Sequence, residues 1–347
     1  MPSHRRPKQP HPRHHTGVVT AAAAAAVVLS AQPATADPLP DPTKKGVQAQ
    51  VDRLYEEATQ ATEKYNGAKE RADGLRREVG NLQDAVARKQ AGLNELRDRI
   101  GLLAAGQYRA GGIDPALQLF LSADPDTYLA RATALDRAGD RQTAALRTFL
   151  DERRTLRQQR DEASERLRDL GAVQRELGER KGEIQGKLRE ARRLLNTLSA
   201  KERARIAEAE ERANRASARV DLGDRPSATG RAAAAFAAAQ SRVGLPYVWG
   251  ASGPSSFDCS GLTSWAFRQA DVSLPRTSQA QASAGTRIDR LSDLRPGDLI
   301  VMRTDLSHIG FYAGNGQILH SPKPGAQVRY ESIARSGMPF MWGVRIG

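Results

Sequence analysis

Three side chains in the last third of the chain have the types and order needed for nucleophilic catalysis. Cys259 is the only cysteine of the 347 residues, and His308 and His320 are the only histidines that follow it. A thiol becomes a useful nucleophile when a base takes its proton and a third group orients that base. The residues predict a Cys-His-His hydrolase site with Cys259 as nucleophile, His308 as base and His320 as the group that orients it. The alternative is a zinc ion held by the same three side chains and a water; we expect no metal and no cofactor.

Cys259 follows a residue that can cap a helix. Asp258 is a good N-cap, and Leu262, Trp265 and Gln269 recur at helical spacing, which predicts a helix from Cys259 to about Ala270. In the first turn of that helix, free N–H groups and the helix dipole would lower the pKa of the thiol, although the charge of Asp258 opposes this. The alternative is a buried structural cysteine.

The two histidines lie on segments that read as strands of one hairpin, closed by Gly314-Asn315-Gly316. A two-residue loop would place the two rings on opposite faces of the sheet. A three-residue loop pairs residue 310 with 320 and places both rings diagonally on one face, within reach of each other. We predict the three-residue loop, in which Gly310 leaves room for the imidazole of His320.

Further candidates for oxyanion or substrate binding surround the cysteine. The backbone N–H of Cys259 is one oxyanion donor, and the hydroxyl of Tyr247 is a candidate for the second, with a role as a rim aromatic as its alternative. Asp258 and Ser260, on either side of the cysteine, complete the predicted set.

The elements that must position these residues occupy about the last third of the chain. All three Trp lie after residue 230, so this part can build a globular core. After a helix over 232–243, the sequence predicts strands over 298–302, 308–313, 317–321, 328–332 and 342–346. We place the boundaries of this domain at 231–347, after a linker at 223–230.

The preceding part of the chain predicts two long helices. Apolar residues alternate at steps of three and four from Val47 to Leu103, and a second such seam runs from Leu146 to Leu198, spans of roughly 85 and 80 Å. Seams of nearly equal length favour an antiparallel coiled-coil hairpin over 43–222; a parallel homodimer is the alternative. Residues 104–145 predict a helical tip, with short helices over 115–121 and 126–135, that either folds over the turn or docks another protein.

Residues 1–36 have the three regions of a secretory signal peptide: basic residues, an apolar run from Gly17 to Ala31, and Ala34-Thr35-Ala36 before the expected cleavage point. A membrane anchor is the alternative, but the run is short for a span of about 20 residues. We therefore expect a secreted protein, and its positive charge favours surroundings such as a cell wall or a membrane surface. Its formal charge of +13, about +9 without the leader, suits anionic surroundings. No basic stripe is interleaved with aromatics, so nucleic acid is not an expected partner.

Several linked motifs of the C-terminal part resemble the NlpC/P60 family of cell-wall cysteine peptidases. They are Tyr247-Val-Trp-Gly250, Asp258-Cys-Ser-Gly261, Arg295-Pro-Gly-Asp298, His308-Ile-Gly310 and His320. The resemblance implies an α+β papain-like fold and a triad of Cys259, His308 and His320 with Tyr247 at the active site. It also implies cleavage of peptidoglycan stem peptides, typically between D-glutamate or D-isoglutamine and the diamino acid.

The N-terminal half resembles, less specifically, the coiled-coil hairpins of murein hydrolases and hydrolase activators that the FtsEX division transporter governs. The basis is Gln107-Tyr-Arg-Ala-Gly111 and the leucine-rich segment after it. The resemblance implies a membrane division-complex partner at the hairpin tip. Because unrestrained cleavage would lyse a cell, we further expect an arm of the hairpin to cover the groove at Cys259. A non-catalytic peptidoglycan-binding or activator protein, and acyl transfer or amidase chemistry on the same triad, remain as alternatives.

Overall fold

The computed structural model describes residues 44–109, 117, 120–121, 125–217, 220–223 and 230–347, all of which belong to one compact unit. The expected leader at 1–36 and most of the expected linker at 223–230 lie outside the described residues. None of the helices in the described ranges has the length and apolar character needed to cross a membrane.

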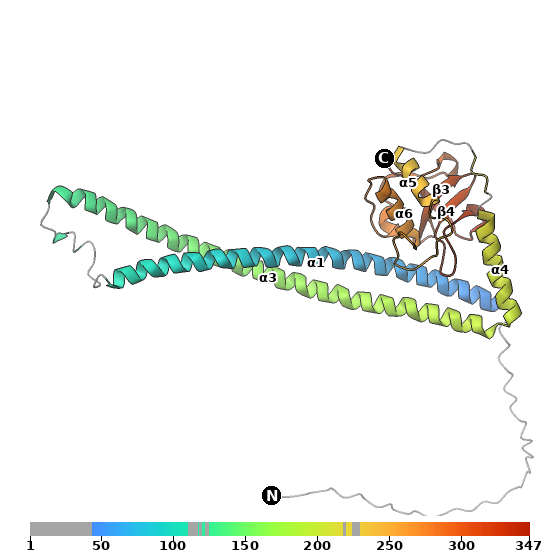
Figure 1. Ribbon diagram of the computed structural model, residues 1–347, viewed down its shortest axis with the longest axis horizontal. Helices are drawn as coiled ribbons and strands as arrows, with labels where there is room; N and C mark the ends of the chain where they lie inside the picture. Colours follow the sequence, from blue (N-terminus) through green and yellow to red (C-terminus); the bar gives the residue numbers. More distant parts are fainter. Residues whose placement is uncertain (1–43, 110–116, 118–119, 122–124, 218–219, 224–229) are drawn as a thin grey trace, which may run out of the picture. The chain divides into compact units, whose positions relative to one another are not determined.

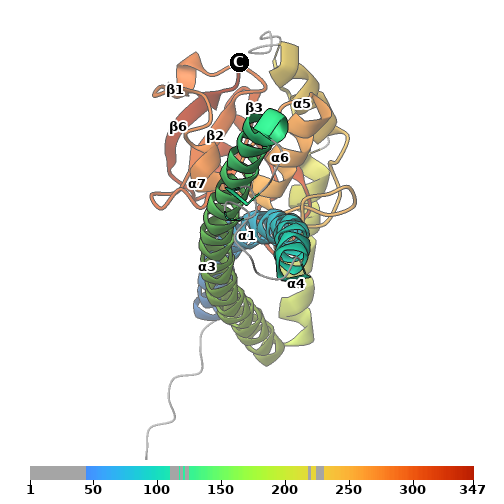
Figure 2. The same cartoon turned by 90° about the vertical axis from the view of Figure 1, so that its left-hand side faces the viewer.

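Two long helices, α1 (Lys44–Arg109) and α3 (Pro125–Thr197), lie side by side along most of their length (Figures 1 and 2). Val47 and Val51 at the start of α1 share an apolar cluster with Ala191 and Leu198 near the end of α3. Ion pairs join the two helices in antiparallel order. Lys187 of α3 lies 2.7 Å from Glu57 of α1, and further along the hairpin Lys89 of α1 pairs with Glu152 of α3. The predicted antiparallel helical hairpin within one chain is therefore confirmed.

The helices reach further into the tip than predicted. α1 ends at Arg109 and α3 begins at Pro125, so residues 126–135 start α3 instead of forming a separate short helix. Proline suits the first position of a helix, and the Ala, Leu and Arg residues that follow are strong helix formers, so the helix does not need an apolar seam there. The other predicted tip helix, over 115–121, lies mostly outside the described residues.

A second difference concerns the end of the hairpin. The sequence predicts a single hairpin over 43–222, whereas the structure breaks at Ser199 and starts a new helix, α4 (Ala200–Ser217). A capping box fixes the break, because the Glu202 N–H donates to Ser199 Oγ and the Ser199 N–H donates to Glu202 Oε2. α4 then leaves α3 (Figure 1) and packs on strand β5 (Arg329–Ser332), where the Tyr330 N–H donates to Ser217 Oγ at 2.7 Å.

The C-terminal part is an α+β domain, as predicted. Its antiparallel sheet has the order β1-β6-β2-β3-β4-β5. The five predicted strands are confirmed with small shifts, and β1 at the sheet edge was not predicted. The strands are β1 (Thr286–Ile288), β2 (Leu299–Met302), β3 (His308–Gly314), β4 (Gln317–His320), β5 and β6 (Phe340–Arg345). The helices are α5 (Gly230–Gln240), α6 (Cys259–Gln269), α7 (Ser278–Gln281) and two 3₁₀ turns, η1 (Leu291–Asp293) and η2 (Ile333–Arg335).

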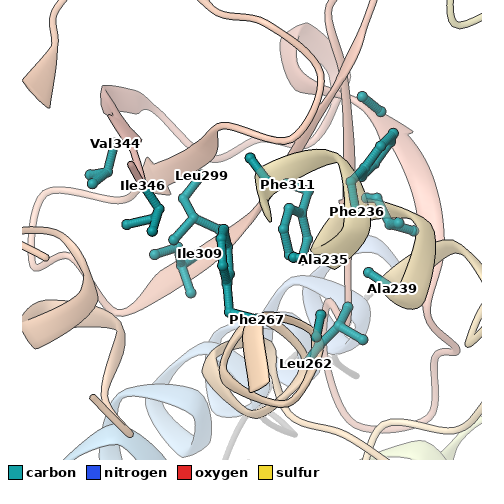
Figure 3. Packing of buried hydrophobic residues seen from close by; sticks show 14 of the residues in the cluster. Ala235, Phe236, Ala239, Leu262, Phe267, Leu299, Ile309, Phe311, Val344 and Ile346 are labelled. Atoms are coloured by element: carbon teal, nitrogen blue, oxygen red, sulfur yellow. The ribbon is translucent and has the colours of Figure 1, made fainter. Parts of the chain in front are cut away.

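Helices α5 and α6 cover one face of this sheet and form the main core with it (Figure 3). Phe267 of α6 stacks on Phe311 of β3 with ring centroids 5.5 Å apart, and Phe236 of α5 packs on the same ring. Burying a large apolar side chain contributes about 1.5–3 kcal/mol, so these contacts fix α6 firmly on β3. The N-terminus of α6 and the first residues of β3 are thereby held beside each other.

Candidate active site

The candidate nucleophile is the first residue of α6, as predicted. The Asp258 carboxylate caps the helix by accepting from the Gly261 N–H at 2.7 Å. The sulfur of Cys259 lies 3.8 Å from the Ser307 carbonyl and accepts a backbone hydrogen bond from Ile309. Ser307 and Ile309 flank His308, so the fold brings the thiol to the start of the strand that carries the predicted base.

The two histidines meet in the predicted register, but the predicted three-residue loop is wrong: Gly314 pairs with Gln317, so the turn has two residues, and a bulge between Tyr312 and Gly314 gives the register. Residues 311 and 312 pair with 319 and 318, the register that places Gly310 opposite His320. His308 Nε2 lies 2.8 Å from His320 Nδ1, and both rings are fully buried. A Cβ at Gly310 would lie 2.8 Å from the Cβ of His320, closer than such atoms approach each other. Only glycine therefore leaves this imidazole its place.

Cys259 and His308 are close in the fold but not hydrogen-bonded in this state. The thiol instead lies 3.6 Å from Glu63 Oε1 of α1, and within the described part of the chain His308 Nδ1 has no hydrogen-bond partner. Because His308 Nε2 already faces His320, Nδ1 is the nitrogen that remains for the thiol proton.

The charge states of this closed site differ from the prediction. Burial, Glu63 and Asp258 raise the pKa of Cys259 well above its usual value, against the helix N-terminus that we expected to lower it. Burial, with His320 next, holds the pKa of His308 well below its usual range. At neutral pH the pair is thus a neutral thiol and a neutral imidazole. The predicted thiolate is wrong for this state, because the helix dipole is outweighed by loss of water and two nearby carboxylates.

Asp258, Ser260 and Tyr247 all lie around the cysteine, as expected from the sequence. Arg276 binds both oxygens of Asp258, at 3.0 and 2.6 Å, and so offsets part of its charge. Arg276 also donates to Ser260 Oγ at 2.8 Å. Burial raises the pKa of Tyr247 well above its usual value, so its hydroxyl keeps its proton and can act as a donor.

Helix α1 covers the cysteine, which is only 1% exposed. Glu63 accepts from Ser260 Oγ at 2.8 Å and from the Ser278 N–H at 2.7 Å. One turn further, Asn66 Nδ2 donates to Asp258 Oδ2 at 3.1 Å. The sulfur is therefore buried by polar side chains of another element and not by hydrocarbon, which disfavours the structural-cysteine alternative.

Further contacts hold α1 along this groove. Tyr65 packs edge-on against Trp249, with ring centroids 5.3 Å apart. Lys323 donates to Asp52 at 2.9 Å, and Arg303 lies 3.3 Å from Glu56. Buried beneath this helix, Glu63 has its pKa raised to about 7 by loss of water and by the charge of Asp258. With a pKa near 7, this carboxyl is protonated in about half of the molecules at neutral pH.

On its far side, His320 contacts a carboxylate that the sequence analysis did not single out. His320 Nε2 lies 3.1 Å from Glu331 Oε2 of β5. Arg329, paired with His320 in the sheet, lies 3.3 Å from the same oxygen. The β4–β5 register places Glu331 opposite Ile318, on the face of His320, so a sequence reading that fixed this register would have found it.

Glu63, Asn66 and Arg276 were also missed. Glu63 and Asn66 lie off the apolar seam of α1, where polar residues read as a solvated helix surface. Arg276 had no motif around it. Among the described residues, no group of three His, Cys, Asp or Glu side chains is placed to hold a metal ion.

Comparisons with known proteins agree with the motifs. Residues 244–344 match the NlpC/P60 family. A probable endopeptidase of Corynebacterium glutamicum (strain R) is 43% identical over 129 residues, which are 35% of this chain and 60% of that protein. A probable endopeptidase of Mycobacterium tuberculosis (strain ATCC 25618 / H37Rv) is 46% identical over 110 residues, 32% of this chain and 28% of that protein.

Among solved structures, NlpC2 from Trichomonas vaginalis is similar at 35% identity, with a TM-score of 0.32, over 36% of this chain and 48% of that one. The chain thus spans less than two thirds of the length of these two curated relatives. The segment that matches the family, 244–344, contains Cys259, His308 and His320. The C-terminal part of this chain, residues 244–344, belongs to the NlpC/P60 family.

Proposed function

We propose that this protein is a secreted cell-wall hydrolase that cleaves peptidoglycan stem peptides with Cys259, and that helix α1 holds it inactive. The observation that carries the proposal is the meeting of the sole thiol with the His308–His320 pair inside an NlpC/P60 domain. The family and the relatives, named as probable endopeptidases, support the reaction class.

In the proposed reaction, Cys259 gives its proton to His308 Nδ1 while the sulfur attacks the carbonyl carbon of the scissile amide. The oxyanion is held by the Cys259 N–H, which has no acceptor within its helix, and by the protonated hydroxyl of Tyr247. As the C–N bond breaks, His308 returns the proton to the leaving amine. A water then hydrolyses the thioester and frees the thiol. The proposed bond joins D-glutamate or D-isoglutamine to the diamino acid.

The restraint follows from what occupies the site. A substrate carbonyl must reach the sulfur, and Glu63 now lies there, joined to Ser260 and to the Ser278 N–H. Attack also needs a hydrogen bond between Cys259 and His308, which the closed state lacks. Moving α1 away would return water to the thiol and remove the charge of Glu63, two of the causes that raise the pKa of Cys259.

The hairpin tip is the proposed site of the partner that moves α1. Tyr108, Phe120 and Leu121 are 86%, 76% and 71% exposed. Large apolar side chains gathered on one end favour a protein contact over free solvent. We propose a membrane division-complex partner of the FtsEX kind there, and export with cleavage near Ala36 would bring the chain to it.

The alternative is a protein that binds peptidoglycan or activates another hydrolase without cleaving. The two functions separate in one experiment on purified peptidoglycan. Chains with α1 loosened by Asn66→Asp, with and without Cys259→Ala, are incubated with the polymer, and both the soluble peptides and the pelleted protein are measured. An enzyme loses peptide release with Cys259→Ala and keeps binding; equal release by both chains would refute the enzymatic function.

A further inference from the structure

The relay behind Cys259 extends past His320 to a fourth residue. The geometry points to Glu331 as a positioning residue that selects the proton arrangement of both imidazoles, so that His308 presents a lone pair to the thiol. Glu331 touches neither the sulfur nor the space in front of it; it acts through His320.

A pair of neutral imidazoles can be joined in two ways. In the first, His308 Nε2–H donates to His320 Nδ1, which leaves His308 Nδ1 with a lone pair. In the second, His320 Nδ1–H donates to His308 Nε2, and the remaining proton of His308 sits on Nδ1. The 2.8 Å distance between the rings suits both arrangements equally. Only the first allows His308 to take the proton of Cys259.

Glu331 decides between them because a carboxylate only accepts hydrogen bonds. Its Oε2 lies 3.1 Å from His320 Nε2, so that nitrogen carries the ring proton and His320 Nδ1 is left as an acceptor. His308 must then donate from Nε2. The fully buried rings leave no room for bulk water to stabilise the other arrangement.

The charges around the relay keep Glu331 ionised and the rings neutral. Burial raises the pKa of Glu331, but the hydrogen bond to His320 and the charge of Arg329 outweigh it and lower the pKa to about 2. Burial lowers the pKa of His320, against the pull of Glu331, and Arg329 and Arg303 add to the lowering. The charged groups that face His320 are thus Glu331 and Arg329 of β5 and Arg303 after β2.

Arg329 contacts Glu210 and Asn214 as well as Glu331, so Glu331 is not its only partner and can also accept a hydrogen bond from His320. Its guanidinium lies 2.7 Å from Glu210 and 3.2 Å from Asn214, both on α4, and 3.3 Å from Glu331. Glu210 therefore offers a matched control: it is a carboxylate of the same network that binds Arg329 and does not touch either imidazole.

The test reads the ring protons directly. Full-length chains labelled with ¹⁵N-histidine are compared at pH 7 by imidazole NMR, with signals assigned through His308→Gln and His320→Gln. We expect both rings to carry the proton on Nε2 in the parent chain and in Glu210→Gln. In Glu331→Ala we expect both rings to populate the Nδ1–H form. A parent His320 protonated on Nδ1, or unchanged rings in Glu331→Ala, would overturn the inference.

A second measurement uses activity and rests on the proposed function. In chains opened by Asn66→Asp, Glu331→Ala should lower kcat by about 10- to 100-fold with little change in KM, the size of loss that follows removal of a group that orients a metal-bound histidine. Glu331→Gln, which keeps an oxygen acceptor, should recover part of the loss; recovery of none would count against positioning. If the ring protons behave as expected but every opened chain is inactive, the hydrolase function fails and the positioning role stands.

Discussion

Replacing Asn66 by Asp should open the site with almost no change in shape. Asn66 Nδ2 now donates to Asp258 Oδ2 at 3.1 Å in a fully buried contact between α1 and the peptidase domain. The substitution replaces the amide donor of residue 66 by a carboxylate that faces the carboxylate of Asp258.

Two estimates of the cost agree. Two unit charges about 4 Å apart repel by about 4 kcal/mol at an effective dielectric constant near 20. If the new carboxyl instead takes up a proton, then protonating a group of pKa about 3.9 at pH 7 costs about 4 kcal/mol. The docking equilibrium of α1 should therefore weaken by up to about a thousandfold at pH 7, less the attraction of the new carboxylate to Arg276, which binds Asp258.

The assay uses the sole cysteine as its own probe. The rate at which a disulfide reagent labels Cys259 reports how often α1 leaves the site, independently of any substrate. The control is Asn81→Asp, the same chemical change at an exposed position of α1. Labelling of Asn66→Asp should be faster than the control by up to about a thousandfold at pH 7, and the difference should shrink as the pH falls toward 4. Equal rates at pH 7 would refute the covering role of α1.

Three further predictions follow from individual contacts. In the unsubstituted chain, docking raises the pKa of Glu63 from 4.5 to about 7, so the docked form binds more protons between these values. Docking should thus be strongest below pH 4.5 and weaken by about 3 kcal/mol as the pH rises through 7, seen as faster labelling relative to a free cysteine peptide. Gly310→Ala would crowd His320 and should cost about 1–3 kcal/mol of unfolding free energy and most of the activity of an opened chain; unchanged urea midpoint and rate would contradict the packing argument. Asp258→Ala leaves the Arg276 guanidinium without its carboxylate and removes the N-cap of α6, so it should lower the free energy of unfolding in urea by about 3–5 kcal/mol. A loss below about 1 kcal/mol would contradict this and show that water replaces the carboxylate.

The C-terminal fold and the central residues could be predicted because their signals are local. The Asp258 cap fixes where α6 starts, and Gly314 to Gly316 fix a loop whose residues all have positive φ. That turn and the bulge before it set the register, and the register sets the meeting of His308 with His320. Each step depends on a few neighbouring residues.

The parts of the site that could not be predicted depend on contacts between elements that are far apart in the sequence. Glu63 is 196 positions from Cys259, and nothing in the spacing of α1 marks which of its polar residues will be buried. The predicted direction of the Cys259 pKa was wrong for the same reason, because the prediction included the helix dipole but neither the burial of the thiol nor the carboxylate that α1 brings to it. Glu331 could have been found from the β4–β5 register, but this connection runs over residues 321–328, and its Pro324-Gly325 turn signal does not fix the register of so long a connection.

The most direct test of the account is the mass of the fragments that an opened chain releases from purified peptidoglycan. The Asn66→Asp chain should release peptides whose new ends are D-glutamate or D-isoglutamine on one side and the diamino acid on the other, and adding Cys259→Ala should abolish them. Stem peptides left intact by a chain whose thiol is demonstrably reactive would contradict the central claim.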